Sequence, residues 1–149
     1  MTRPGAILLV EDDDDDAELT TMAFSEAGIF NPLVRVEDGV EALDYLFCRC
    51  KYQNREPPDL PIVVLLDLKL PRISGLEVLG SIRADPKTKA LPVVMLTSSV
   101  EDRDRLAAYS NHANSYVQKP VDHEHFVAAA RQLGLYWLLL NVPPPEGDR

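Results

Sequence analysis

The chain has 149 residues, which suits one ordinary domain, and 46% of them are hydrophobic, as in globular proteins with a sizeable core. Its 15 basic and 24 acidic residues give a formal charge of −9, which argues against binding to nucleic acid or to anionic membrane surfaces. No apolar stretch reaches the roughly 18 residues of a membrane span, so we expect a cytoplasmic protein.

The first predicted elements are a buried strand and an acidic helix. Residues 6–10 form an apolar run, typical of a strand buried on both faces of a parallel sheet. A helix is predicted over residues 13–28, with acids at its positive N-terminal end and Gly28 as its C-terminal cap. The acidic run 13–16 lacks the alternating ligands of a calcium-binding loop, so we interpret it as a solvated helix start.

A second strand and helix follow. Residues 33–36 predict a short strand, and an apolar stripe over residues 40–50 predicts a helix. Cys48 and Cys50 lie two positions apart in this helical pattern and so point in different directions, which predicts reduced packing thiols. The proline-rich and charged residues 51–61 predict a surface loop.

Further apolar runs predict three more strands, over residues 62–66, 93–96 and 115–118. The first of these leads through a loop into a helix that begins near Gly75. The Asp85-Pro86 dipeptide closes that helix, because the residue before a proline disfavours helical geometry.

The remaining helices complete the predicted fold. A capping box of Ser98 and Glu101 begins one helix, and Asp122 can cap a long final helix. The alternation of strands and helices predicts an α/β fold, a doubly wound five-stranded parallel sheet with helices on both faces and an extended C-terminal helix. We expect a single domain over residues 1–140 and a short proline-rich tail over residues 141–149.

Polar side chains follow four of the apolar runs: Glu11 and Asp12, Asp67, Thr97, and Lys119. The carboxyl ends of parallel strands meet at one edge of the sheet, so these side chains should share a pocket. Clustered carboxylates raise one another's pKa or require a cation, and an all-oxygen donor set suits Mg²⁺ better than zinc. The residues therefore predict a Mg²⁺-assisted phosphoryl site, with Asp67 as the nucleophile and with Thr97 and Lys119 holding the added oxygens.

Four motifs within residues 6–133 resemble the receiver domain of two-component response regulators. They are Val10-Glu11-Asp12, Leu66-Asp67-Leu68-Lys69-Leu70-Pro71 with Gly75, Leu96-Thr97-Ser98, and Tyr116-Val117-Gln118-Lys119-Pro120. The resemblance implies a flavodoxin-like receiver fold with Asp67 as the phosphoacceptor.

The resemblance also implies roles for the residues around the phosphoacceptor. The implied Mg²⁺ ligands are Asp67, Asp12, Glu11 acting through water, and the Lys69 backbone carbonyl. Thr97 and Tyr116 match the family's switch positions, and Lys119 matches its lysine before a cis-proline bond. Mg²⁺ is thus the implied cofactor.

The implied function is that of a single-domain response regulator. Such a protein accepts a phosphoryl group from a sensor histidine kinase and signals by a phosphorylation-dependent change of its binding face. It is not an enzyme in its own right, beyond Mg²⁺-dependent self-phosphorylation and autodephosphorylation. Residues 38–46, 51–61 and 136–143 also look like the stand-alone regulators of bacterial phytochromes, which implies a bacteriophytochrome as the kinase.

The apolar end of the final helix predicts a homodimer. One stripe of this helix is accounted for by the core, and other apolar residues lie off the stripe, so a monomer would leave a large patch exposed. The phytochrome regulators, which commonly dimerise through this end, point the same way. The expected interface residues are Leu135, Trp137, Leu138 and Leu139.

Three other functions compete with this reading. A Mg²⁺-dependent phosphatase with an aspartyl nucleophile needs a second carboxylate two residues after the nucleophile, where this chain has Lys69. A flavin electron carrier needs a phosphate cradle after the first strand, where residues 11–16 are acidic. A pseudo-receiver that acts only as a docking module should lack Asp67, Thr97 or Lys119, and all three are present.

Overall fold

The computed structural model describes residues 5–54, 60–67, 70–97, 115–118, 124, 127–128 and 131–132, with only the backbone described at 96–97 and 115–118. The elements are β1 (Ile7–Val10), α1 (Asp14–Glu26), β2 (Leu33–Val36), α2 (Gly39–Leu46), the 3₁₀ helix η1 (Cys50–Tyr52), β3 (Val63–Leu66), α3 (Gly75–Ala84), β4 (Val93–Thr97) and β5 (Ser115–Gln118). None of the described helices is long and apolar enough to cross a membrane.

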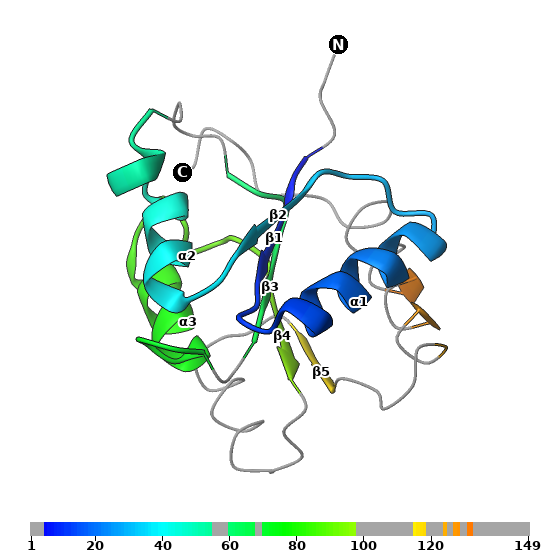
Figure 1. Cartoon of the computed structure of the whole chain (residues 1–149). Coiled ribbons are helices and arrows are strands. Elements are labelled where there is room, and N and C mark those ends of the chain that lie inside the picture. The colour runs from blue at the N-terminus through cyan, green and yellow to red at the C-terminus, as the bar shows by residue number, and fades with distance from the viewer. Residues whose placement is uncertain are drawn as a thin grey trace.

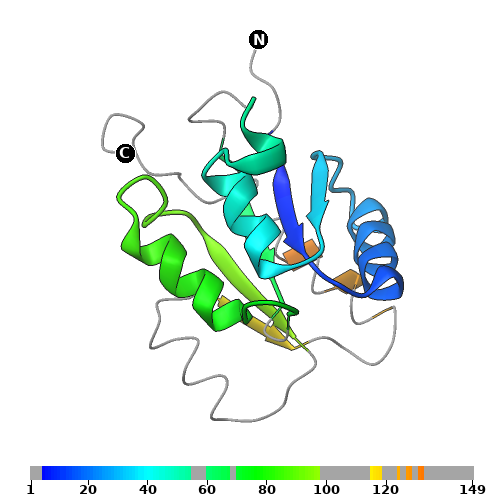
Figure 2. The same ribbon diagram turned by 60° about the vertical axis from the view of Figure 1, so that its left-hand side comes forward.

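The five strands form one parallel sheet in the order β2-β1-β3-β4-β5. Helix α1 covers one face, and α2 and α3 cover the other (Figure 1). Figure 2 shows the same three layers from a second direction. The predicted doubly wound α/β fold is confirmed.

The apolar runs become central strands because both of their faces are covered. Leu8 and Val10 pack with the α2 and α3 side of the core, whereas Ile7 and Leu9 pack with the α1 side. All four side chains of β1 are at most 1% exposed. The alternation of side chains along a strand thus feeds two separate cores, one on each face of the sheet.

Helix α1 begins and ends where its sequence signals predict. The Asp13 side chain accepts a hydrogen bond from the Asp16 amide at 2.9 Å, so the acidic run is a helix start. At the other end Gly28 has a φ of +82°, and its amide and that of Ile29 bond back to Ser25 and Phe24. This is a Schellman motif with glycine at the left-handed position.

Helix α2 ends at Leu46, earlier than predicted, because a second Schellman motif stops it. The amides of Cys48 and Arg49 bond to Tyr45 and Asp44 at 3.4 and 2.8 Å, and Cys48 has a φ of 56°. The prediction that both cysteines belong to the helix and pack is therefore wrong: Cys50 is exposed and begins η1. Neither cysteine takes part in a disulfide bond.

A polar cluster fixes η1 to α2. The Glu41 carboxylate accepts hydrogen bonds from the Tyr52 hydroxyl at 2.8 Å and the Glu37 amide at 2.9 Å, and Lys51 Nζ lies 2.6 Å away. The rings of Tyr45 and Tyr52 meet edge to face with centroids 5.2 Å apart. Burial raises the pKa of Glu41, but the hydrogen bonds from Lys51, Glu37 and Tyr52 and the lysine's charge outweigh it, so the pKa lies below its ordinary value.

Replacing this carboxylate should destabilise the protein in a pH-dependent way. Glu41→Gln should lower the free energy of unfolding at pH 7 by about 1–2 kcal/mol, because three donors lose a charged acceptor. Since the folded pKa is lowered, the stabilisation is complete above the ordinary pKa of 4.5 and is lost as the pH falls through the folded value. Urea unfolding at several pH values checks this.

The matched control for this measurement is Glu18→Gln, which changes an exposed glutamate of α1. That variant should unfold with nearly wild-type stability across the same pH range. A Glu41→Gln deficit that stays constant down to low pH would show that the lost contacts are not those of the ionised carboxylate.

The C-terminal part of the predicted fold is described in fragments. The backbone is helical at residues 124, 127, 128, 131 and 132, and Val127 is buried on the α1 side of the core. The Ser98 and Glu101 capping box, the Asp122 cap, the start of the tail and the predicted dimer residues lie outside the described residues. They remain predictions.

Candidate functional site

The sheet brings the ends of β1 and β3 together. Val10 pairs with Leu66 in the parallel register, and the Asp67 amide donates to the Val10 carbonyl at 3.2 Å. On the other side of β1, the Glu11 amide donates to the Val36 carbonyl at 3.0 Å. Ladder hydrogen bonds therefore continue up to the first residue after each strand and fix the main chain there.

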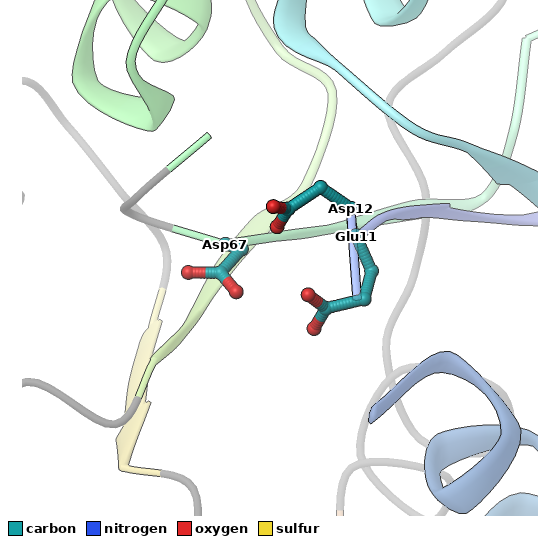
Figure 3. Close-up of side chains that lie close together, drawn as sticks. All are labelled: Glu11, Asp12 and Asp67. Carbon is teal, nitrogen blue, oxygen red and sulfur yellow. The ribbon is translucent and has the colours of Figure 1, made fainter. Parts of the chain in front are cut away.

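Three carboxylates meet at this edge of the sheet. Glu11, Asp12 and Asp67 each offer an oxygen atom, and these atoms lie within 4.8 Å of one another. Figure 3 shows the side chains gathered around a common space, two from the end of β1 and one from the end of β3. The burial is graded, since Glu11 is 1% exposed, Asp67 is intermediate and Asp12 is exposed.

The donor set fits a hard divalent cation. Carboxylate oxygens are the ligands that Mg²⁺, Mn²⁺ and Ca²⁺ take, whereas zinc sites draw on histidine and cysteine. Within the described parts of the chain, these three residues form the one group whose acidic side chains lie close enough together to hold a metal ion. A cation would also offset the repulsion among three like charges.

The other predicted site residues are placed only in part. Thr97 ends β4 and pairs with Gln118 of β5, so its main chain lies at the same edge of the sheet as the carboxylates. Tyr116 lies in β5 and pairs with Met95. Lys119 and Lys69 lie outside the described residues, as do the side chains of Thr97 and Tyr116.

The β3–α3 connection packs tightly against the start of α2. A Cβ atom on Gly39 would lie 2.8 Å from the Ile73 carbonyl oxygen and 2.5 Å from Ile73 Cγ1, so only glycine fits there. Arg72 in the same connection has a φ of 70°, and its Nη1 lies 3.7 Å from Asp38 Oδ2. These contacts hold residues 72 and 73 of the connection against the start of α2.

Sequence reasoning missed Arg35, which lies beside the carboxylates. Its Nε donates to the Glu11 carbonyl at 3.0 Å, and its Nη1 donates to Asp14 Oδ1 at 2.8 Å. A charged residue on a short strand indicates solvent exposure, and nothing in the sequence shows that its partner is a main-chain oxygen. The side chain is in fact only 27% exposed.

Comparisons with known proteins agree with this site. A family model described as the response regulator receiver domain matches residues 7–131, which contain all three carboxylates. Curated relatives include the probable methanogenesis regulatory protein FilR2 of Methanothrix harundinacea, 41% identical over 95% of this chain and 88% of the relative. Response regulator Rcp1 of Synechocystis sp. is 35% identical over 91% of this chain and 90% of its own length.

Solved structures share the fold over 95% of this chain. The phosphorylated cyanobacterial phytochrome response regulator RcpA matches with a TM-score of 0.87 and 33% identity over 99% of that chain. The Mn²⁺-bound form of Rcp1 matches with a TM-score of 0.85 and 33% identity over its whole length, 100%. The bacteriophytochrome response regulator RtBRR is 47% identical, with a TM-score of 0.77 over 85% of that chain.

Proposed function

The chain belongs to the response regulator receiver domain family, and on that premise we propose that it accepts a phosphoryl group on Asp67 from a sensor histidine kinase. The observation that carries this proposal is the position of Asp67 within 4.8 Å of Glu11 and Asp12 at the end of two adjacent strands. A half-buried carboxylate beside two others is poorly suited to a purely structural role, because each would repel the next.

The proposed reaction transfers a phosphoryl group from a phosphohistidine to Asp67. A carboxylate oxygen of Asp67 attacks phosphorus, the phosphorus–nitrogen bond breaks, and the imidazole of the kinase leaves. Asp12, Asp67 and the Lys69 carbonyl would hold Mg²⁺ directly, and Glu11 would hold it through water. The bound ion would supply positive charge that offsets the charge of the phosphoryl oxygens.

Thr97 and Lys119 complete the proposed site. The Thr97 hydroxyl would hydrogen-bond to one phosphoryl oxygen, and the Lys119 ammonium would pair with another. Support for this assignment comes from the main chain, since Thr97 ends β4 at the carboxylate edge and Gln118, which precedes Lys119, is its partner in β5. Tyr116 would act as the second switch residue.

We further propose that the kinase is a bacteriophytochrome in a cytoplasmic signalling pair. RcpA and RtBRR are named as regulators of phytochromes, and both match nearly all of this chain. FilR2 is instead named for the regulation of methanogenesis, so the choice of a bacteriophytochrome as the kinase rests on RcpA and RtBRR. The homodimer through Leu135, Trp137, Leu138 and Leu139 stays a prediction.

Intact-mass measurement with a small phosphodonor and Mg²⁺ separates the candidate functions. A receiver gains the mass of one phosphoryl group, and peptide mapping places it on Asp67. A phosphatase with an aspartyl nucleophile would instead release inorganic phosphate continuously from phosphomonoesters, and a docking module would gain no mass. Phosphotransfer from a bacteriophytochrome, compared with an unrelated histidine kinase, tests the choice of partner.

A change at Thr97 should separate phosphorylation from signalling. Phosphorylation adds about −1.5 to −2 charges at Asp67, and the Thr97 hydroxyl is the group proposed to follow that charge inward. Thr97→Ala should therefore accept the phosphoryl group but lose most of the phosphorylation-dependent change in affinity for a partner, measured by titration with the kinase. Thr97→Ser is the matched control, because it keeps the hydroxyl and should respond as wild type does. Equal affinity changes in Thr97→Ala and wild type would contradict this route.

A further inference from the structure

Arg35 occupies an unusual position for a charged residue. It lies on β2, the edge strand of the sheet, and pairs with Leu9 of β1. Its neighbours Val34 and Val36 pack with the α2 and α3 side of the core, so the Arg35 side chain lies on the α1 face with Leu33. It thus reaches over the end of β1 toward the first turn of α1.

The guanidinium joins the two ends of the connection that carries the ligands. Nε donates to the Glu11 carbonyl at 3.0 Å, directly after β1, and Nη1 donates to Asp14 Oδ1 at 2.8 Å, on the first residue of α1. Glu11, which is one of these anchors, and Asp12, which lies between them, provide two of the three carboxylates. The planar fork of an arginine can hold both anchors at once, which a lysine ammonium cannot do in the same geometry.

Stability alone does not account for this arrangement. Nη2 of Arg35 is buried without a hydrogen-bond partner among the described residues, and it lies 3.7 Å from a carboxylate oxygen of Glu37. A buried donor without an acceptor is destabilising, and the ion pair with Asp14 is weak because the Asp14 side chain is 84% exposed. The remaining contact is the bond from Nε to the Glu11 carbonyl at 3.0 Å, which ties the side chain to the main chain beside the carboxylates.

We propose that Arg35 is a positioning residue of the cation site, which holds the main chain at Glu11 so that Glu11 and Asp12 stay within reach of Asp67 before a cation binds. The inference rests on the proposed function only in taking these carboxylates as the cation ligands. Binding to a preorganised set of ligands is tighter, because less freedom is lost on binding. Loss of the fork should therefore weaken cation binding.

The positive charge of Arg35 acts in the opposite direction. A guanidinium near the site repels a divalent cation, so a pure charge effect predicts tighter binding when the charge is removed. The two roles are separated by Arg35→Lys, which keeps the charge but loses the fork, and by Arg35→Gln, which loses both. Positioning predicts that both variants bind the cation more weakly.

The test is calorimetric titration of the full chain with MgCl₂ and MnCl₂ after removal of metal with a chelator. Arg35→Lys and Arg35→Gln should each raise Kd about threefold to tenfold, while the phosphorylation rate at saturating Mg²⁺ changes far less. Arg83→Lys is the matched control, because Arg83 also donates from Nη1 to main-chain carbonyls, those of Lys89 and Leu91, away from the site. It should lower Tm and leave Kd unchanged.

Each other outcome overturns the proposal. Wild-type Kd in Arg35→Lys with tighter binding in Arg35→Gln would show a charge effect alone. An unchanged Kd in both variants with a lowered Tm would show a purely structural residue. Absence of cation binding by the wild type would instead refute the proposed cation site itself, and the inference with it. Should Arg35→Gln fail to fold, Arg35→Lys alone still decides between positioning and charge.

Discussion

Asp67→Asn is expected to abolish phosphorylation without unfolding the protein. The amide keeps the shape of the side chain but removes the nucleophilic oxygen, so neither a small phosphodonor nor a kinase should add mass to the variant. The main-chain bond from the Asp67 amide to the Val10 carbonyl is unaffected by the change. Because one of three neighbouring carboxylates loses its charge, Tm should stay the same or rise.

Asp15→Asn is the matched control for this experiment. Asp15 is an exposed acid of the first turn of α1, so its substitution changes the net charge equally but leaves the three-carboxylate cluster intact. This variant should be phosphorylated at the wild-type rate. A phosphoryl group found on Asp67→Asn after incubation with the cognate kinase would mean that another residue is the acceptor.

Asp12→Ala is expected to remove the stabilisation that a divalent cation gives to the wild type. At a cation concentration one hundred times Kd, binding to the folded state adds about 2.7 kcal/mol. For a chain of this size that corresponds to a rise in Tm of about 5–10 °C. Asp12 is the exposed member of the cluster, so alanine should cost little stability in the absence of cation. Thermal unfolding with and without Mg²⁺ measures the difference.

The acidic run makes the choice of control important. Asp15→Ala removes an acid from the same run but from the helix, and it should keep the full cation-dependent shift. A shift that survives in Asp12→Ala would show that the cation binds elsewhere along the run, for example among the first-turn acids of α1. The two variants therefore test whether Asp12, rather than the first-turn acids of α1, is a ligand of the cation.

The strands and the carboxylate cluster could be predicted from the sequence because two strong signals coincide. Continuous apolar runs such as residues 7–10 and 63–66 are typical of central parallel strands, and each is followed at once by an acid. Parallel topology then requires the ends to meet, which the structure confirms for Glu11, Asp12 and Asp67. The proximity of Asp67 to Glu11 and Asp12 thus follows from the parallel topology of the sheet and not from the local sequence around each residue.

The end of α2 could not be predicted because its stop signal is conformational. Helices α1 and α2 end in the same Schellman motif, but the left-handed position holds Gly28 in one and Cys48 in the other. Glycine at such a position indicates a left-handed turn in the sequence, whereas cysteine does not. The apolar stripe of α2 also continues past the turn, to residue 50. The sequence therefore predicts a helix that extends to residue 50 and packs Cys50, whereas α2 ends at Leu46 and Cys50 is exposed.

The partners that polar side chains find elsewhere in the chain could not be predicted from the sequence either. Arg35 finds the Glu11 carbonyl only because β2 and β1 are neighbours in register. Glu41 pairs with Lys51 and accepts a hydrogen bond from Tyr52 only because α2 ends early and the chain turns back as η1. In both cases the partner is set by where the backbone goes, which composition and spacing do not encode.

Pairing of β1 with β3 joins parts of the chain that are far apart in sequence, with Val10 opposite Leu66. Such non-local pairing is a slow step in folding, because a long loop must close before any contact forms. The carboxylate cluster is complete only after that step, since Asp67 comes from β3 and its two companions from β1. A divalent cation therefore cannot hasten the search for this pairing and acts only once it has formed. A cation bound to the cluster would therefore be expected to slow unfolding rather than to speed folding.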